Sequence, residues 1–447
     1  MPASNRFFSA TSRRKALAAS LAGALGLAAA DASATCPSLV ATSCADSGAG
    51  SLRDIIACAD SGDTVDLTQL ACSTISLNSR LNVTQADLTL NGPGADQLTI
   101  DGGFHDRVLL HHIFSNVGTL SISGATITRG YYSGAGPKGG CISSGASVTL
   151  AYSRVSLCTV NATTTQAAIG GGIYTYGDLT LTHSTVTKNQ ATSLIANGHA
   201  RGGGVAVNYN FSAKYSTISG NDAQATTATY SRGGGIYAPR RDFTLAESTV
   251  SGNSAGIAAG IDANIASTRA MLISNSTISR NKGIDWPALY TQHTTTIRNS
   301  TIAFNQATAN SAAVEAFNAS LDLQSTIIAD NLGAGVEFDL SGSSVVVSGA
   351  DNLIRSTGLT VPGSLIGSCP RLGPLTANGG PTLTHPLLSG SLAIESGNNN
   401  AALGVDQRGS GFGRVVGTGA DIGAYERQPG AIDDRLFKSG LELGCDE

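Results

Sequence analysis

Hydrophobic residues recur at fixed offsets around one repeated phrase. The phrase appears as HSTVTKN from His183, YSTISGN from Tyr215, ESTVSGN from Glu247, NSTISRN from Asn275 and NSTIAFN from Asn299. Relative to its serine, apolar residues stand five and three positions before it and two positions after it. This alternation at period two indicates short β-strands rather than helices.

The same frame extends over most of the chain. Its origins lie between 24 residues apart, from Ser276 to Ser300, and 32 residues apart, from Ser184 to Ser216. Repeats of this length indicate a solenoid, propeller or array. The apolar position after the serine is occupied by Ile127, Val155, Val186, Ile218, Val250, Ile278, Ile302 and Ile328, the last after a one-residue slip from Ser325 to Thr326.

A third short strand precedes each pair, after a glycine-rich turn such as GGCI or GGGI. Its first apolar residues are expected at Ile142, Ile173, Val205, Ile236, Ile261, Leu289, Val314 and Val336. Three short strands per turn bury nothing alone and need neighbours above and below. The pattern therefore predicts an all-β fold, a right-handed single-stranded parallel β-helix of about 9–11 coils, in which adjacent coils lie about 4.8 Å apart.

Two polar columns accompany the apolar ones. Threonines directly after the frame serine, such as Thr217, are expected to form an outward ladder. The asparagine five residues after the serine stands at a turn, where stacked amides can satisfy one another and the buried backbone. We interpret these asparagines as structural rather than catalytic.

The chain divides into five predicted regions. We expect a signal peptide at 1–34, an N-terminal cap and first coil at 35–87, the β-helix at 88–355, a C-terminal cap region at 356–427 and a tail at 428–447. Both ends of an open solenoid need covering. One short helix with Ser51 as its N-cap is expected to cover the first coil. An irregular C-terminal segment is expected to cover the last coil.

The N-terminus indicates export. Arg13 and Arg14 precede an apolar run that ends at Ala34, and either ordinary secretion or the twin-arginine route is compatible with it. No other stretch is long and apolar enough to span a membrane. The formal net charge of −4 and the absence of a basic stripe disfavour a nucleic-acid partner.

The 8 cysteines all follow the predicted cleavage point. An even number of cysteines in an exported chain favours disulfides. The spacings CxxC and HxxxH, which would indicate a metal site, do not occur. Cys141 and Cys158 hold the glycine and asparagine positions of one coil, so we expect them to be bonded to each other.

No cofactor is expected. The acids Asp406, Asp421 and Glu426 are read as turn residues and partners of nearby arginines, with a calcium site as the alternative.

Several motifs resemble a known family. GSLRDIIACADSGDTVDL, LTLNGPGADQLTIDGG, GPLTANGGPTLTHPLLSGSLAIESGN, DQRG and ADIGAYE, together with the coil motifs, are similar to the choice-of-anchor Q family of bacterial secreted and surface β-helix proteins. The coil motif alone is shared with other β-helices, including polymorphic outer-membrane proteins. The resemblance implies an exported surface or adhesin-like protein and brings no catalytic residues.

One outward column carries the candidate chemistry. It follows the third-strand apolar column by one residue and reads Tyr174, Ala206, Tyr237, Asp262, Tyr290, Glu315 and Glu337. Its tyrosines can form stacking platforms for a sugar chain. Its acids are candidate catalytic groups, with Asp262 and Glu315 two coils apart, near the separation that an inverting glycosidase needs.

Three interpretations of this column remain. It is a solvated sheet face, a noncatalytic glycan-binding surface, or the groove of a polysaccharide hydrolase or lyase. We expect surface adhesion or glycan contact, with a polysaccharide-degrading enzyme as the alternative. The segments from Gln190 to Arg201 and from Asp222 to Arg232 lengthen two coils on one side and offer a further surface for a partner.

Overall fold

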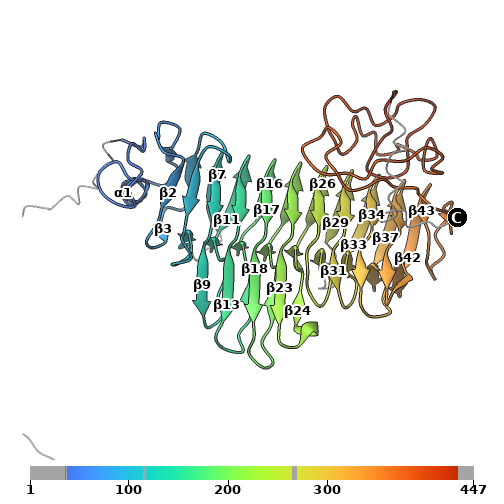
Figure 1. The fold of residues 1–447 in the computed structure, drawn as a ribbon, viewed down its shortest axis with the longest axis horizontal. Helices are drawn as coiled ribbons and strands as arrows, with labels where there is room; N and C mark the ends of the chain where they lie inside the picture. The colour runs from blue at the N-terminus through green and yellow to red at the C-terminus, as the bar shows by residue number, and fades with distance from the viewer. Residues whose placement is uncertain (1–35, 37, 114–116, 264–268, 431–447) are drawn as a thin grey trace, which may run out of the picture. The chain divides into compact units, whose positions relative to one another are not determined.

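The computed structural model describes residues 36, 38–113, 117–263 and 269–430. The predicted signal peptide and most of the predicted tail lie outside this part of the chain. The described residues form a right-handed parallel β-helix of about ten turns, as the repeat predicts. Each turn visits three long parallel sheets, which we call sheets I, II and III, and Figure 1 shows the coils stacked along one axis.

Sheet I holds the strand before the frame serine. Its members are β1 (Thr64–Asp66), β4 (Leu88–Asn91), β7 (Thr119–Ser123), β11 (Ser147–Ala151), β16 (Leu179–Thr182), β21 (Phe211–Lys214), β26 (Phe243–Ala246), β29 (Ala270–Ser274), β33 (Thr294–Arg298), β37 (Ser320–Gln324) and β42 (Val346–Ala350).

Sheet II holds the strand after the frame serine. Its members are β2 (Thr74–Ser76), β5 (Thr99–Asp101), β8 (Thr126–Thr128), β12 (Arg154–Ser156), β17 (Thr185–Thr187), β22 (Thr217–Ser219), β27 (Thr249–Ser251), β30 (Thr277–Ser279), β34 (Thr301–Ala303), β38 (Ile327–Ala329), β43 (Leu353–Ile354) and β44 (Leu365–Ile366).

Sheet III holds the third strand of each coil. Its members are β3 (Leu81–Val83), β6 (Leu109–His111), β10 (Ile142–Ser144), β15 (Ile173–Thr175), β20 (Val205–Val207), β25 (Ile236–Tyr237), β28 (Ile261–Ala263), β32 (Leu289–Thr291), β36 (Val314–Phe317) and β41 (Leu340–Ser343).

The predicted apolar columns are in register. In sheet II, Val186 pairs with Ile218, Ile218 with Val250, and Ile302 with Ile328, which confirms the one-residue slip. Both Ile218 and Ile328 are fully buried in the main core cluster. The inward stack of β-branched and leucine side chains therefore forms the core of the solenoid.

The last member of the sheet III column differs from the prediction. Val314 pairs with Leu340, not with Val336. Val336 lies four positions earlier with the same parity, in β40 (Val336–Glu337), which pairs antiparallel with β39 (Leu332–Gly333). Two apolar residues of equal parity cannot be separated by periodicity alone, because a short hairpin inserted between them leaves the alternation unchanged. The strands β31 (Lys282–Gly283) and β35 (Gln306–Ala307) complete this small sheet.

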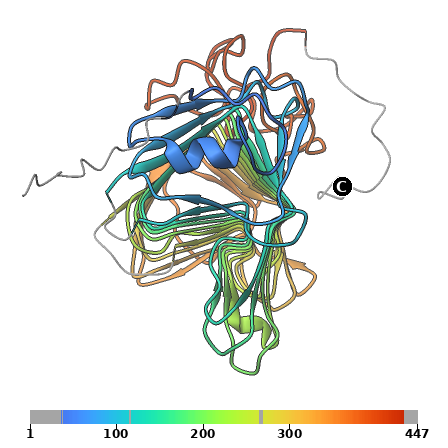
Figure 2. The same ribbon diagram turned by 90° about the vertical axis from the view of Figure 1, so that its left-hand side faces the viewer.

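The helix predicted at the N-terminal end is present as α1 (Leu52–Cys58). The Ser51 side chain accepts a hydrogen bond from the Asp54 backbone N–H at 3.2 Å and caps the helix. Leu52, Ile55 and Ile56 are buried against the first coil. Figure 2 looks toward this end of the solenoid and shows α1 across its opening.

Four coils carry a projection that we call the flange. Its outgoing strands are β9 (Tyr131–Gly134), β13 (Thr159–Ala162), β18 (Gln190–Ser193) and β23 (Asp222–Ala225), and its returning strands are β14 (Ala168–Ile169), β19 (Ala200–Arg201) and β24 (Ser231–Arg232), with the short helix η1 (Ala228–Tyr230). A small cluster of alanines with Val160 fills the space between them. The two lengthened segments predicted to lie on one side do so, but they are largely paired strands rather than loops (Figures 1 and 2).

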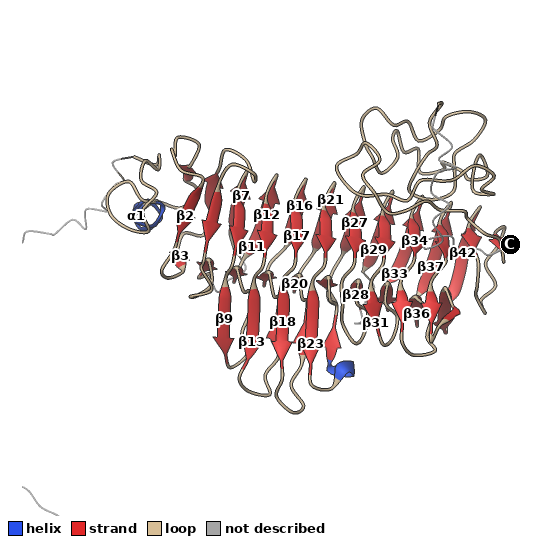
Figure 3. Ribbon diagram, viewed as in Figure 1, coloured by secondary structure: helices blue, strands red, loops and turns tan. Residues whose placement is uncertain are grey.

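Within the predicted C-terminal cap region, Leu359 and Val361 pack on the main core, and residues 372–427 form what we call the C-terminal segment. It folds back along the outer face of sheet II, where Ile422 and Tyr425 pack on Ile327 and Ala329. Figure 3 shows this segment as loops over the C-terminal half of the sheet. The outward threonine ladder is half-buried at Thr217, whereas Thr277 is buried beneath this segment.

Candidate functional site

The outward column of sheet III is one continuous ladder. Backbone pairing aligns Ser143 with Tyr174, Ala206, Tyr237, Asp262, Tyr290 and Glu315 in successive coils. The next residue is Ser341, because the shift to Leu340 also moves its neighbour. Glu337 lies in the β39–β40 hairpin outside this ladder, and its side chain lies outside the described residues.

The flange places a row of basic residues beside this ladder. Successive pairing joins Lys138, Ile169, Arg201 and Arg232. Each returning strand turns into sheet III through a glycine at positive φ, such as Gly202 at +66°, where a Cβ atom would come within 2.3 Å of the Val205 carbonyl oxygen. Only glycine permits this sharp corner, which folds the basic row over the outward face of sheet III.

The cations of the basic row lie over the tyrosine rings. Lys138 Nζ is 4.8 Å from the centroid of the Tyr174 ring, Arg201 Cζ is 5.6 Å from that of Tyr237, and Arg232 Cζ is 5.5 Å from that of Tyr290. Each distance suits a cation–π interaction. The indole of Trp286 also stacks on Tyr290, with 4.5 Å between ring centroids.

The expectation that this column faces solvent is therefore wrong for most of its members. Tyr174 is 7% exposed, Tyr290 9% and Asp262 0%. They point away from the core of the solenoid, but the flange and its basic row cover them. The ring faces of Tyr237 and Tyr290 are not open stacking platforms, because a guanidinium occupies each of them.

Asp262 forms a buried ion pair. Its carboxylate accepts a hydrogen bond from Arg232 Nε at 2.6 Å. Burial raises the pKa of Asp262, and the charge of Arg232 acts in the opposite direction. A carboxylate in this position stabilises the junction between flange and sheet III and has no open path to a substrate.

Glu315 lies two coils further along the ladder than Asp262 and is half-buried. Ser341 donates a hydrogen bond to its carboxylate. Burial raises the pKa of Glu315, and the bond from Ser341 lowers it in part. The structure thus provides one partly accessible carboxyl group at this end of the ladder rather than the accessible pair that the sequence suggested.

An open pocket lies at the N-terminal end of the same ladder. Its volume is about 300 Å³. The residues around it are Leu110, His111, His112, Ile113, Lys138, Ser143, Ser144, Gly145, Tyr174 and Tyr176. We call it the Tyr174 pocket, and it combines apolar walls with hydroxyl, imidazole and ammonium groups.

Hydrogen bonds fix the polar wall of this pocket. The Tyr174 hydroxyl accepts a bond from Asn208 Nδ2 at 2.8 Å, one coil further along. The His111 ring bonds Ser144 Oγ at 2.8 Å and the Gln85 carbonyl oxygen at 2.9 Å. Burial lowers the pKa of His111, which keeps its imidazole neutral. Tyr176 is more open, with 43% of its surface exposed.

Sequence reasoning found Tyr174 but missed the other members of the pocket. Lys138 and Tyr176 lie in the turns that enter β10 and leave β15. Lys138 stands four residues before Ile142, as Arg201 does before Val205, so the basic column itself is readable in the sequence. Nothing in the sequence places this column over the tyrosines. The pair of histidines at 111 and 112 was visible in the sequence, but nothing in their spacing indicated a pocket.

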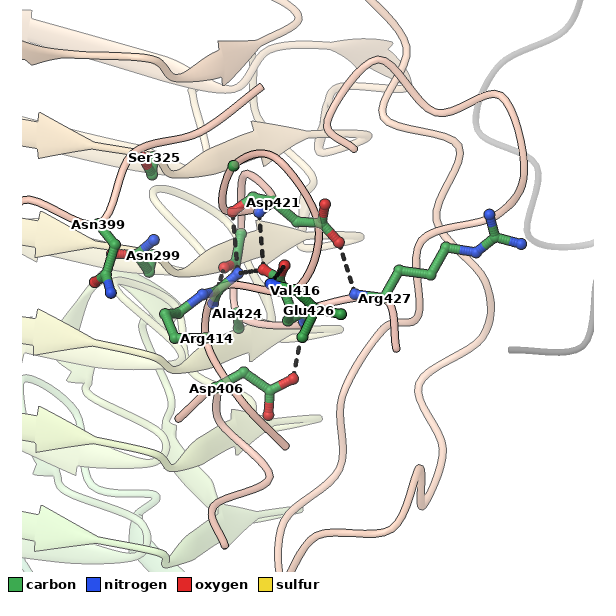
Figure 4. A network of polar contacts seen from close by, with 12 residues as sticks. Asn299, Ser325, Asn399, Asp406, Arg414, Val416, Asp421, Ala424, Glu426 and Arg427 are labelled. Carbon is green, nitrogen blue, oxygen red and sulfur yellow. Dashed lines mark hydrogen bonds and ion pairs between the residues drawn. The ribbon is translucent and has the colours of Figure 1, made fainter. Parts of the chain in front are cut away.

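The acids of the C-terminal segment form a structural network. Glu426 accepts hydrogen bonds from Arg414 Nη2 at 2.7 Å and from the Asp421 backbone N–H at 2.8 Å. Asp406 pairs with Arg408 at 2.6 Å. Figure 4 shows Asp406, Arg414, Asp421 and Glu426 close together in the C-terminal segment. Burial raises the pKa of Glu426 to about 7.

This arrangement matches the reading of these acids as turn residues and arginine partners. Calcium remains the alternative expected from the sequence. Within residues 36–430, no group of three or more histidine, cysteine, aspartate or glutamate side chains is arranged to hold a metal ion, leaving aside the short stretches that are not described.

Three disulfides join described cysteines. They link Cys36 to Cys58, Cys44 to Cys72, and Cys141 to Cys158, the pair singled out in the sequence. Cys445 lies outside the described residues. Disulfides of this kind persist in oxidising compartments. No helix in the described part of the chain is long and apolar enough to cross a membrane.

Comparisons with known proteins give one structural likeness. No family model matches the sequence, and no curated protein matches it. Among solved structures, the chain resembles one described as the crystal structure of pectate lyase Pel9A, with 14% sequence identity and a TM-score of 0.48. The match covers 89% of this chain and 98% of that chain.

Proposed function

We propose that this protein is an exported, noncatalytic glycan-binding protein, and that the Tyr174 pocket holds part of a sugar chain. The observation that carries the proposal is the pocket of about 300 Å³ on the outward face of sheet III. A pocket with apolar walls and a few fixed polar groups is the usual form of a small-ligand site. The disulfides support a secreted or surface location.

The lining suits a sugar in two ways. The exposed ring of Tyr176 offers an apolar face with a polar tip, which suits the C–H face of a pyranose. The hydroxyls of Ser143 and Tyr174 can donate to or accept from sugar hydroxyls.

The alternative is a polysaccharide hydrolase or lyase that uses Asp262 and Glu315. Asp262 is fully buried and paired with Arg232, so it is poorly placed to act as a general base or acid. Glu315 lacks an accessible second carboxylate beside it in the ladder. Release of new reducing ends or unsaturated products from a polysaccharide panel, abolished by Glu315→Gln, would establish the enzymatic alternative.

The first test compares two exposed tyrosines on different faces. Tyr176 is 43% exposed at the pocket, and Tyr152 is 60% exposed at a corner between sheets I and II. We expect Tyr176→Ala to lower the affinity for a retained polysaccharide about tenfold. We expect Tyr152→Ala to leave binding unchanged.

Affinity electrophoresis across a panel of neutral and acidic polysaccharides provides the measurement. Thermal melting of both variants checks that neither has lost its fold. If no polysaccharide retains the wild-type protein, or if Tyr176→Ala binds as well as wild type, the Tyr174 pocket is not a glycan site.

A further inference from the structure

The covering of the tyrosine ladder changes what a ligand meets on this face. Lys138 and Arg201 lie over the rings of Tyr174 and Tyr237. A ring whose face already holds a cation contributes to binding by orienting that cation rather than by stacking on a sugar. The surface beside the pocket is therefore cationic rather than aromatic.

The three cations of the basic row are not equivalent. Arg232 is neutralised by the fully buried carboxylate of Asp262 at 2.6 Å. Among the described residues, no ion pair is formed by Lys138 or Arg201. The Arg201 Nε atom is also buried and has no hydrogen-bond partner among them.

Charge along the ladder is distributed unevenly. No carboxylate lines the Tyr174 pocket, whereas Lys138 does. The carboxylates of the ladder, Asp262 and Glu315, come in later coils toward the C-terminal end. Lys138 and Arg201 thus lie at the N-terminal end of the ladder, ahead of its carboxylates.

The spacing of these charges suits a repeating chain. Lys138, Ile169 and Arg201 occupy successive coils, so the two cations are separated by two coil rises, or about 10 Å. An extended polysaccharide that carries one negative group per disaccharide presents charges at a comparable repeat. The row runs parallel to the solenoid axis, which fixes the direction of such a chain.

From this geometry we infer that the glycan is anionic, with carboxylate or sulfate groups held by Lys138 and Arg201. The inference rests on the proposed glycan-binding function and names its ligand class. Charge-assisted hydrogen bonds to these two cations anchor the chain, while the pocket holds one sugar unit. Because the net charge of the protein is −4, attraction is local to this row and is screened by salt.

The test uses matched polymers and matched charge variants. Affinity of the full-length exported protein is measured for polygalacturonate and its methyl ester, and for dextran sulfate and plain dextran, at low and at physiological ionic strength. Carboxylate and sulfate are thereby separated as sources of the charge. We expect at least one anionic polymer to bind about tenfold or more tightly than its neutral counterpart.

The variants Lys138→Gln and Arg201→Gln are each expected to lower that affinity about fivefold to tenfold and to reduce its salt dependence. The control is Lys188→Gln, which removes an exposed lysine from the turn after β17 in sheet II, away from the basic row. It should leave binding unchanged. Unaltered thermal melting shows that a loss of affinity is not a loss of fold.

Each other outcome is decisive. Equal affinity for charged and neutral polymers, still reduced by Tyr176→Ala, overturns the anionic class and leaves glycan binding in place. Binding of neither kind overturns the proposed function itself. Retention of duplex DNA as strong as that of the glycans, lowered equally by Lys188→Gln, shows nonspecific cation exchange and overturns the inference.

Discussion

At the scale of single residues, the asparagine column shows how buried polar groups are satisfied. Nδ2 of each asparagine donates to Oδ1 of the next at 2.9 Å from Asn189 to Asn221, Asn253, Asn281 and Asn305. At one end the Cys158 backbone N–H donates to Asn189 Oδ1, and at the other Asn331 donates to Asp339 Oδ1. The ladder is therefore a continuous buried network, with a hydrogen-bond donor at one end and an acceptor at the other.

Removing one amide from this network should destabilise the fold strongly. Asn253→Ala removes the acceptor of the Asn221 backbone N–H, one of the two acceptors of the Asn221 side-chain amide, and the side-chain donor to the Ile218 carbonyl oxygen. We expect a loss of about 3 kcal/mol or more in the free energy of unfolding, since each unsatisfied buried group costs about 1–3 kcal/mol. Urea denaturation measures it.

Asn210→Ala serves as the control. Asn210 is exposed and accepts one long bond, from the Asp242 backbone N–H at 3.3 Å. Its loss should cost less than about 1 kcal/mol. Equal losses for the two variants would show that the buried ladder contributes no more than a surface turn.

At the scale of elements, each strand of sheet II has an inner and an outer face with different tolerances. In β22, Ile218 is fully buried between Val186 and Val250, whereas Thr217 is half-buried on the outer face. The same period-two alternation runs through every coil. In this coil, a polar substitution is therefore costly at Ile218 and mild at Thr217.

The pair Ile218→Asp and Thr217→Asp tests this assignment. Ile218→Asp buries an unpaired carboxylate, and we expect it to cost about 4 kcal/mol or more, or to prevent folding. Thr217→Asp keeps its charge at the surface and should cost about 1 kcal/mol or less. Thermal melting followed by circular dichroism compares them. Similar melting shifts for both variants would mean that the two faces are reversed.

At the scale of the whole molecule, the C-terminal segment turns the outer face of sheet II into a second interior. His385 is fully buried there, with Nε2 bonded to Ser279 Oγ at 2.8 Å and Nδ1 to the Gly373 carbonyl oxygen at 2.7 Å. Burial lowers the pKa of His385 to about 4. The C-terminal segment therefore packs on sheet II with the His385 imidazole in its neutral form.

Docking should weaken in acid because of His385. Between pH 6.5 and about 4 the unfolded chain binds a proton that the folded chain does not, so stability is present above pH 6.5 and is lost as pH falls toward 4. Glu426, whose pKa is raised to about 7, gives the opposite slope, since its contribution is lost as pH rises from 4.5 to 7. The two effects must be separated with a variant.

His385→Gln removes the titrating group while keeping hydrogen-bonding capacity. We expect the stability difference between wild type and His385→Gln to shrink by about 3 kcal/mol from pH 7 to pH 4. Urea denaturation at a series of pH values gives this difference directly. A difference that is constant over this range would show that His385 does not titrate with folding.

The sequence by itself determined the solenoid, its inward columns and its N-terminal helix. These features depend on contacts between residues at the same position of neighbouring coils, such as Ile218 with Val250. Because the repeat shows the same spacing in every coil, these contacts can be recognised in the sequence. The slip at Thr326 was also readable, because a single displaced register restores every following apolar residue. One strand position was predicted wrongly: Leu340, not Val336, pairs with Val314. A short hairpin precedes Leu340 and leaves the alternation of apolar residues unchanged.

Only the tertiary structure decided what covers the outer faces. The flange places Arg201 and Arg232 over tyrosines of later coils, and the C-terminal segment buries Thr277 against Gln407, 130 residues away. The C-terminal segment shares no period with the coils, so no column in the sequence registers its contacts. The arginines of the flange do form a column, but their position over the tyrosines depends on how the flange folds back. For the same reason the repeat revealed which residues of sheet III point outward, but not that Asp262 is buried or that the pocket lies beside Tyr174. Periodicity fixes direction from the core, whereas exposure depends on what folds back from elsewhere in the chain.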